Sequence, residues 1–300
     1  MELAAVPYLL LVGALLAVQA GANVQLSTAM GSPFGASALQ LSLGAAILLA
    51  LAAVAGGLGA LALLDDVEPW HLAGGLGSAL YITAGILLFP RIGAVVTVGL
   101  FIAGQMLASL ALDGGGWLGV EREPLGAAAA AGAAGVLAGA TLIVRAHGGA
   151  ARPRAHWLAL ALLGGAVLPV QGAVNARLRA DLDAPIATGA WSFVVAAAAM
   201  LALVGVLGRR AAPRVDGLGR VPWWGWLGAL CGATYVTSVF LLIPEIGVAP
   251  TIALTVAGQQ LASLAVDRYG LLRLPRRPIG RVRLAGVAVL LLGVAAIQAG

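Results

Sequence analysis

Long apolar runs dominate this chain and restrict what it can fold into. Ten stretches of about 20 residues contain almost no charged side chain, and about 20 apolar residues are what an α-helix needs to cross the hydrocarbon core of a bilayer. Only 10% of the 300 residues are charged, against roughly a quarter in soluble domains. The chain is therefore predicted to be an all-α polytopic membrane protein. The spans are expected at about residues 5–25, 34–56, 71–90, 93–112, 125–145, 157–177, 185–207, 223–243, 247–266 and 282–299.

The N-terminal segment and the single cysteine set two further limits. The first seven residues, MELAAVP, contain Glu2 and no basic residue, whereas a cleavable signal peptide begins with a positively charged segment. The first span is therefore expected to remain in the mature protein. Cys231 is the one cysteine of the chain, so an intrachain disulfide is excluded.

The arginines are distributed unequally between the two faces of the membrane. With ten spans, both termini lie on one face, and 14 of the 17 basic residues fall on the other. The positive-inside rule then places both termini outside and the arginine-rich face in the cytoplasm. The net charge of +5 is attributed to this topology and to anionic lipid headgroups rather than to nucleic acid. The 14 residues are Arg91, Arg145, Arg152, Arg154, Arg209, Arg210, Arg214, Arg220, Arg268, Arg273, Arg276, Arg277, Arg281 and Arg283.

An internal repeat organises the chain. The segment GQMLASLALD at 104–113 returns as GQQLASLAVD at 258–267, and LYITAGILLFPRIG at 80–93 returns as TYVTSVFLLIPEIG at 234–247. Self-similarity at a fixed offset indicates duplication of one structural unit. The predicted division is a first five-helix repeat at 1–148, a linker at 149–154 and a second five-helix repeat at 155–300.

The two copies are predicted to be inverted with respect to each other. Five spans are an odd number, so the second copy enters the membrane from the opposite side. Loop charges agree: the loop at 57–69 is acidic and its counterpart at 208–222 has four arginines, while the loop at 113–124 has one arginine and its counterpart at 267–283 has six. Many secondary transporters are built from inverted repeats, with the solute site near the membrane midplane between them.

A pair of amides recurs in the first span of each copy. Gln19 and Asn23 are four residues apart, as are Gln171 and Asn175, so each pair lies on one helix face. Amides on one face belong against protein or water rather than lipid. They are candidate solute-binding residues; the alternatives are interhelical hydrogen bonds that hold the bundle together and, for the asparagines, helix capping.

Two more polar pairs recur in later spans. Gln105 and Gln259 occupy matching positions in the fourth spans, and Tyr81 and Tyr235 do so in the third spans. A buried tyrosine needs a partner for its hydroxyl, so these residues serve either helix packing or solute binding. We take all four as candidate solute-binding residues.

The titratable residues do not indicate an enzyme. His71, His147 and His156 fall at span ends without the spacing of a metal site, and no catalytic residue, metal or cofactor is expected. Asp113 and Asp267 end the fourth spans. They are expected at the membrane surface, either solvated or paired with an arginine.

Three motifs resemble a known family. Q-x-x-x-N-x-x-L, P-x-x-G and G-Q-x-x-A-S-L-x-x-D occur in both halves and are similar to the YdcZ-type branch of the drug/metabolite transporter superfamily. The resemblance implies two five-helix units fused as an antiparallel internal pseudo-dimer, and hence a monomer. Small multidrug resistance proteins, which are distant relatives, carry a glutamate in the first helix, whereas neither first span here contains a carboxylate.

Together these features predict a transporter of the bacterial inner membrane that exports a small polar or amphipathic solute by alternating access. Gln19 and Gln171 are expected on either side of the membrane centre, facing one space, with Tyr81 and Tyr235 as its walls. Two alternatives remain: a membrane scaffold or assembly protein that transports nothing, and a translocator of lipids or other amphiphiles.

Overall fold

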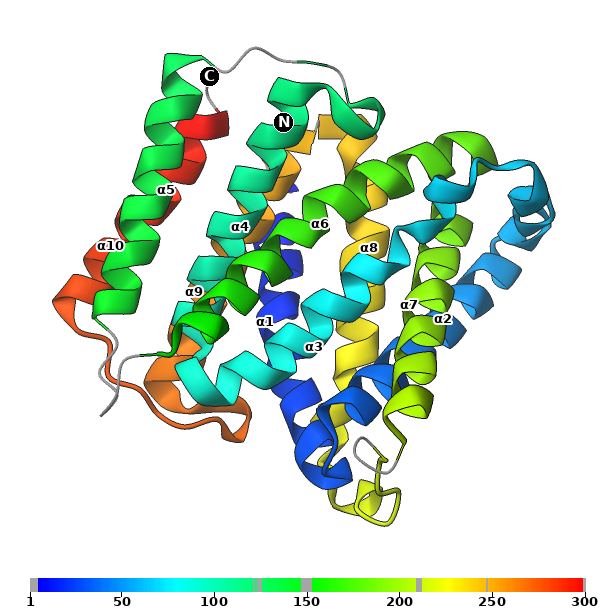
Figure 1. Ribbon diagram of the computed structural model, residues 1–300, viewed down its shortest axis with the longest axis horizontal. Coiled ribbons are helices and arrows are strands. Elements are labelled where there is room, and N and C mark those ends of the chain that lie inside the picture. The colour runs from blue at the N-terminus through cyan, green and yellow to red at the C-terminus, as the bar shows by residue number, and fades with distance from the viewer. Residues whose placement is uncertain are drawn as a thin grey trace.

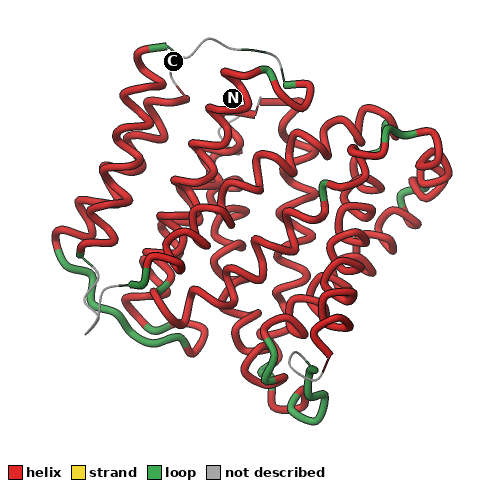
Figure 2. The backbone as a smooth tube through the Cα atoms, in the orientation of Figure 1, coloured by secondary structure: helices red, strands yellow, loops and turns green. Residues whose placement is uncertain are grey.

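The computed structural model describes residues 5–120, 122, 126–146, 153–208, 212–246 and 248–298, and in these residues the regular structure is helical, without a strand (Figures 1 and 2). The linker expected at 149–154 lies outside the described residues except for 153 and 154. The α-helices are α1 (Ala5–Met30), α2 (Pro33–Val54), α3 (Gly75–Ile92), α4 (Ala94–Gly115), α5 (Ala127–Arg145), α6 (Ala155–Leu182), α7 (Pro185–Leu207), α8 (Leu227–Ile246), α9 (Val248–Tyr269) and α10 (Arg281–Gln298). Short 3-10 helices connect them: η1 (Gly57–Asp66), η2 (Pro69–Ala73), η3 (Trp117–Gly119), η5 (Leu218–Arg220), η6 (Trp223–Trp226) and η7 (Leu271–Arg273).

The helices have the length and the surface of a membrane protein. Among the described residues, seven are long and apolar enough to cross a bilayer: α1, α2, α3 with the preceding η2, α4, α5, α6 and α7. Large apolar side chains also lie on the outside of the bundle, and Val54 and Val206 are 89% and 85% exposed. A soluble monomer rarely exposes so much apolar surface. The chain is therefore a multi-pass helical membrane protein.

Local sequence signals set several helix boundaries. Ser32 caps α2, because its Oγ accepts the backbone N–H of Gly35 at 3.0 Å, and Pro33 at the first helical position needs no N–H partner. Pro185 likewise occupies the first position of α7, where its missing N–H needs no partner. Between α3 and α4 the chain turns at Gly93, whose φ of 84° is unfavourable for any residue with a Cβ.

The backbone conformation of the turn that follows α4 recurs in the turn that follows α9. Gly116 and Gly270 both adopt left-handed conformations, with φ of 65° and 64°. Two residues later Leu118 and Leu272 also have positive φ, 55° and 56°, although such values are unfavourable for leucine. The sequence similarity between the two halves thus extends to the unusual backbone of these two turns.

The extensive helix contacts join the two halves of the chain. α1 packs on α9 and α8, and α6 packs on α4 and α3 in the same arrangement. α2 pairs with α7, and α5 pairs with α10 at one edge of the bundle in Figure 1. The halves interlock rather than lying side by side as separate units.

Four glycines allow the central helices to cross at backbone distance. On the α1–α9 crossing, a Cβ at Gly13 would lie 1.8 Å from the carbonyl oxygen of Thr255, and one at Gly258 would lie 1.9 Å from that of Leu10. The α6–α4 crossing repeats this pattern. A Cβ at Gly165 would lie 2.0 Å from the Phe101 oxygen, and one at Gly104 would lie 2.0 Å from the Leu162 oxygen. Such close approach between membrane helices requires small residues.

Asp267 is buried rather than solvated at the surface. Its side chain is only 2% exposed, and its two carboxylate oxygens accept the backbone N–H groups of Ala94 at 2.9 Å and Val95 at 3.1 Å. These N–H groups belong to the first turn of α4, where a negative charge is favourable. The guanidinium of Arg283 lies 3.8 Å away. Of the two predicted environments, solvated or paired with an arginine, Asp267 therefore has the second. Asp113 is half-buried.

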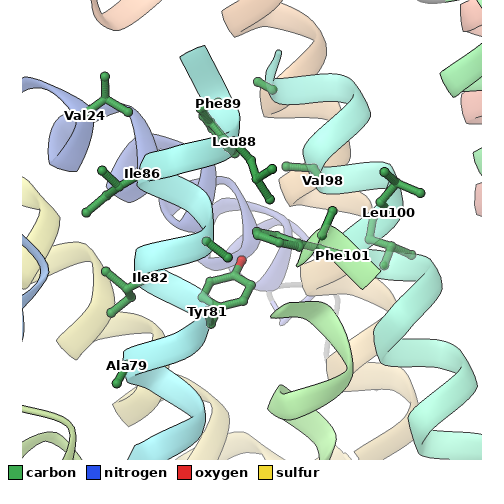
Figure 3. Packing of buried hydrophobic residues seen from close by; sticks show 14 of the residues in the cluster. Val24, Ala79, Tyr81, Ile82, Ile86, Leu88, Phe89, Val98, Leu100 and Phe101 are labelled. Atoms are coloured by element: carbon green, nitrogen blue, oxygen red, sulfur yellow. The ribbon is translucent and has the colours of Figure 1, made fainter. Parts of the chain in front are cut away.

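Apolar side chains from α3 and α4 form much of the core. Figure 3 shows Tyr81 among Ile82, Phe101 and their neighbours. The rings of Tyr81 and Phe101 lie 4.8 Å apart between centroids. This distance is in the favourable range for aromatic pairs. The core therefore holds Tyr81 in place beside the polar residues described next.

Candidate functional site

The amides of α6 are hydrogen-bonded to serines. Gln171 accepts a hydrogen bond from the Ser78 hydroxyl at 3.0 Å through Oε1, and its Nε2 lies 2.8 Å from the same hydroxyl oxygen. One turn further along, Asn175 donates to the Ser192 hydroxyl at 3.0 Å. Both amides are buried. The amide pair in the first span of the second repeat is therefore hydrogen-bonded to α3 and α7.

The amides of α1 lie against two glycines of α8, much as Asn175 lies against Gly74 on the α6 side. A Cβ at Gly228 would lie 2.1 Å from Oδ1 of Asn23, and one at Gly232 would lie 2.5 Å from Nε2 of Gln19. Both amides are buried. Among the described residues, Gln19 has no hydrogen-bond partner and Oδ1 of Asn23 is unpaired. Oδ1 of Asn175 is likewise unpaired, so the two pairs differ chiefly at the glutamines: Gln171 is hydrogen-bonded to Ser78, whereas Gln19 keeps its hydrogen-bonding capacity.

The tyrosines connect the third helix of each half to the fourth helix of the second half. Nε2 of Gln259 donates to the Tyr81 hydroxyl at 2.7 Å, and Tyr235 hydrogen-bonds to the side chain of Thr255. The counterpart of Gln259 is Gln105, whose Nε2 is buried without a partner among the described residues. The paired glutamines of α4 and α9 thus differ in their bonding as well.

A small cavity lies where the two halves meet. It measures about 40 Å³ and is lined by four of the eight candidate residues, Gln19, Gln171, Tyr81 and Tyr235. The sequence therefore identified residues that the fold brings together from α1, α6, α3 and α8. Asn23, Asn175, Gln105 and Gln259 do not line the cavity. Gln259 hydrogen-bonds to Tyr81 of the lining, and Asn23 and Asn175 lie one helical turn from Gln19 and Gln171.

Sequence reasoning missed the other seven lining residues, among them Ser78, Gly232 and Phe193. Ser78 and Gly232 lie beside the two glutamines, and Phe193 of α7 closes another side. Ser78 and Gly232 are counterparts in the repeat, at the ends of GGLGS (74–78) and GALCG (228–232). Small residues in that pattern indicate helix packing. Only the structure shows that they face amides.

The cavity contains uncharged polar groups. Among the described residues, its lining includes amides, phenols and one serine, and no carboxylate or guanidinium. No group of His, Cys, Asp and Glu side chains able to hold a metal occurs in the described part of the chain. Amides and phenols both donate and accept hydrogen bonds, so the arrangement is suited to neutral polar groups.

The comparisons with known proteins agree with this architecture. A family model described as "Putative inner membrane exporter, YdcZ" matches residues 4–142 and again 156–296. The search of curated proteins found no match. A solved structure titled "Crystal structure of protein" is similar, with a TM-score of 0.60 and 20% identity over 97% of this chain and 96% of that one. At this identity the likeness shows the fold alone.

Proposed function

Because the chain belongs to the YdcZ family of inner membrane exporters, we propose that it moves a small polar or amphipathic solute out of the cytoplasm by alternating access. The observation that carries the proposal is the meeting of Gln19 and Gln171, one from each half, at a single cavity. Transporters built from two repeats place their solute site in this position. The eight candidate residues named from the sequence are proposed to form the solute site and the polar groups next to it.

The proposed architecture has ten membrane-spanning helices in two inverted repeats, 1–148 and 155–300. Three observations support it. The family model matches each half separately, the packing of α1 on α8 and α9 is repeated by α6 on α3 and α4, and the start of α1 and the end of α10 lie at the same end of the bundle in Figure 1. An even number of spans requires this last arrangement.

The proposed topology puts both termini outside the cytoplasm. Support comes from the 14 arginines assigned to the opposite face and from the positive-inside rule. A reporter that is active only in the cytoplasm should be inactive when fused to the C-terminus, and active when inserted in the loop at 208–222. The reverse pattern would overturn the orientation.

The cavity must widen before it can hold a solute. At about 40 Å³ it has room for only a few water molecules, whereas sites for small organic ligands measure about 300–1,000 Å³.

An uncharged lining also offers no group that carries a proton through a membrane site. The proposed cargo is therefore neutral at its recognised end, and exchange should proceed without a pH gradient. Since the two halves already pair with each other, the working unit is proposed to be a monomer.

An efflux assay tests the proposal. Liposomes containing the purified protein are loaded with a mixture of small polar and amphipathic solutes, and mass spectrometry measures which of them leave the vesicles. At least one solute should leave faster than from liposomes containing the Gln19→Leu variant. If the wild type and the variant release every solute at the rate of empty liposomes, the scaffold alternative is the correct one. Faster movement of labelled lipid between leaflets, without solute efflux, would identify a lipid translocator.

A further inference from the structure

A basic pocket lies at the end of α9, on the arginine-rich face. It has a volume of about 560 Å³ and is lined by Arg268, Tyr269, Arg276, Arg277, Pro278 and Ile279. Three of these six residues are arginines and none is a carboxylate. The pocket is separate from the central cavity, which shares no lining residue with it.

The arginines of the pocket are held in position by backbone carbonyls and a ring. Nε of Arg276 donates to the carbonyl oxygen of Tyr269 at 3.1 Å. The guanidinium of Arg277 donates to the carbonyl oxygens of Pro90 and Arg91 at 3.1 and 3.2 Å. Arg268 lies 5.8 Å from the centre of the Tyr269 ring, within the range of a cation–π contact. A structured loop, rather than a set of free side chains, thus presents these charges.

The nearest carboxylate, that of Asp267, interacts electrostatically with Arg277 as well as with Arg283, and one carboxylate cannot neutralise two guanidinium groups together with those of Arg268 and Arg276. Asp267 is buried, its oxygens accept the N–H groups of Ala94 and Val95, and Arg283 lies beside it. Its charge is therefore already compensated. Three guanidinium groups around one concavity attract an oxyanion, and phosphate matches their geometry especially well.

The rest of the lining favours a lipid as the source of that phosphate. Tyr269 is 57% exposed, and tyrosines concentrate at the depth of the headgroups. Pro278 and Ile279 add apolar surface to the same pocket, and the exposed Leu271 follows close by. A phosphate carried on a glycerol and acyl chains can use both kinds of surface, whereas inorganic phosphate uses only the arginines.

The repeat makes this pocket specific to one half. The positions equivalent to Arg268 and Tyr269 are Gly114 and Gly115, and the position equivalent to Arg277 is Glu123. Of the three arginines, only Arg276 has a basic counterpart, Arg122, whose Nε donates to the carbonyl oxygen of Gly114. Arg122 thus makes a bond similar to that between Arg276 and Tyr269, although its acceptor lies one residue earlier. Because this turn forms without counterparts of Arg268 and Arg277, those two arginines are not needed to form the turn.

We propose that this pocket binds the phosphate of an anionic phospholipid headgroup, through Arg268, Arg276 and Arg277 together. The site is independent of the proposed transport function, because none of its residues lines the central cavity. Each arginine near an anionic headgroup should change the affinity by about fivefold.

Native mass spectrometry of the detergent-purified full chain tests the site. Phosphatidylglycerol should be retained more strongly than phosphatidylcholine. Arg268→Gln should weaken phosphatidylglycerol binding about fivefold, and Arg268→Gln with Arg276→Gln about 25-fold. Arg122→Gln is the matched control, since it removes the equivalent loop bond on the other face, and it should leave binding unchanged. Arg268 has no backbone hydrogen bond to lose, so its variant remains informative if the Arg276 variant does not fold.

Three results would overturn the proposal. Equal retention of the two lipids would show that the headgroup charge is not recognised. Equal losses in the Arg122→Gln and Arg268→Gln variants would show a general charge effect. Millimolar inorganic phosphate that displaces phosphatidylglycerol completely, with the same dependence on Arg268, would identify a site for free phosphate instead of lipid.

Discussion

The two sides of the central cavity are counterparts in sequence but differ in chemistry. On the α6 side, Gln171 is bonded to Ser78 and Asn175 to Ser192. On the α1 side, the position equivalent to Ser78 is Gly232, and the position equivalent to Ser192 is Gln40. A hydroxyl that satisfies an amide has been replaced by a glycine in one case and by a further amide in the other.

The difference leaves more hydrogen-bonding capacity on the α1 side, although Oδ1 of Asn175 on the α6 side is also unpaired among the described residues. Among the described residues Gln19 has no partner, and Oδ1 of Asn23 and Oε1 of Gln40 are unpaired. A buried amide without a partner costs about 1–3 kcal/mol, and such a cost is tolerated where a ligand or water supplies the missing bonds. We infer that a duplicated site can divide its tasks: Gln171 is engaged within the protein, whereas Gln19 keeps hydrogen-bonding capacity that a solute can use.

The largest effect is expected from Gln19→Leu. Efflux should fall about tenfold or more, the loss expected when about 1.4 kcal/mol of hydrogen bonding to the solute is removed. The melting temperature should stay close to that of the wild type, because no internal hydrogen bond is broken. Parallel efflux and thermal unfolding measurements on the purified variant check both statements. Normal efflux from this variant would show that the α1 side does not bind the solute.

Gly232→Ser makes the α1 side resemble the α6 side. The new Cβ would lie 2.5 Å from Nε2 of Gln19, so the flexible end of that side chain must move, and the new hydroxyl can then hydrogen-bond to it. Efflux should fall roughly fivefold while stability is maintained or rises by about 1 kcal/mol, the typical net value of one hydrogen bond. Gly232→Ala is the control, since it displaces the amide without offering a hydroxyl. A serine variant that is no more stable than the alanine variant would contradict the argument.

On the α6 side, substitutions should affect stability more than efflux. Ser78→Ala and Gln171→Leu should each lower the free energy of unfolding by roughly 0.6–1.7 kcal/mol, as for other hydrogen bonds between membrane helices. The double variant should lose less than the sum, because both substitutions break the same pair. Unfolding of the four proteins in mixed micelles measures this coupling. Additive losses would mean that the pair does not act as a unit, and a greater efflux defect for Gln171→Leu than for Gln19→Leu would reverse the assignment of the two sides.

The smallest effects are expected from the tyrosines. Tyr81→Phe removes the 2.7 Å partner of Gln259 and should cost about 1 kcal/mol of stability. Tyr235→Phe removes the bond to Thr255 and should cost a similar amount. Efflux should change less than about twofold in both, since the hydroxyls are already engaged inside the protein. A selective loss of efflux in one variant would show that its hydroxyl contacts the solute.

Four of the eight candidate residues named from the sequence line the central cavity, and the other four do not. Gln19 and Gln171 were recognisable because an amide in an apolar helix has few acceptable surroundings, and the repeat paired them. Ser78 and Gly232 were not recognisable, because their importance depends on which helix packs against α1 and which against α6. That choice is set by backbone crossings between distant segments, and no local pattern reports it.

Asp267 shows a second limit of sequence reasoning. A carboxylate at the end of an apolar helix resembles a surface residue, and its burial could not be anticipated from α9 alone. The burial follows from the α3–α4 turn at Gly93, which brings the N–H groups of Ala94 and Val95 to the carboxylate. The helices lie close to the predicted ranges, and seven in the described residues are long and apolar enough to cross a bilayer, because apolar length is a property of each segment rather than of its neighbours.

The four glycine crossings also determine which helices can move as one rigid body. Gly13 and Gly258 bring α1 and α9 into backbone contact, and Gly165 and Gly104 do the same for α6 and α4. Two such contacts fix both the position and the angle of each pair, because no flexible side chain lies between the helices. Each pair combines helices from opposite halves, so one half cannot swing away from the other as a unit. The opening that admits a solute should therefore come from α3 and α8 moving relative to these two cross-half pairs.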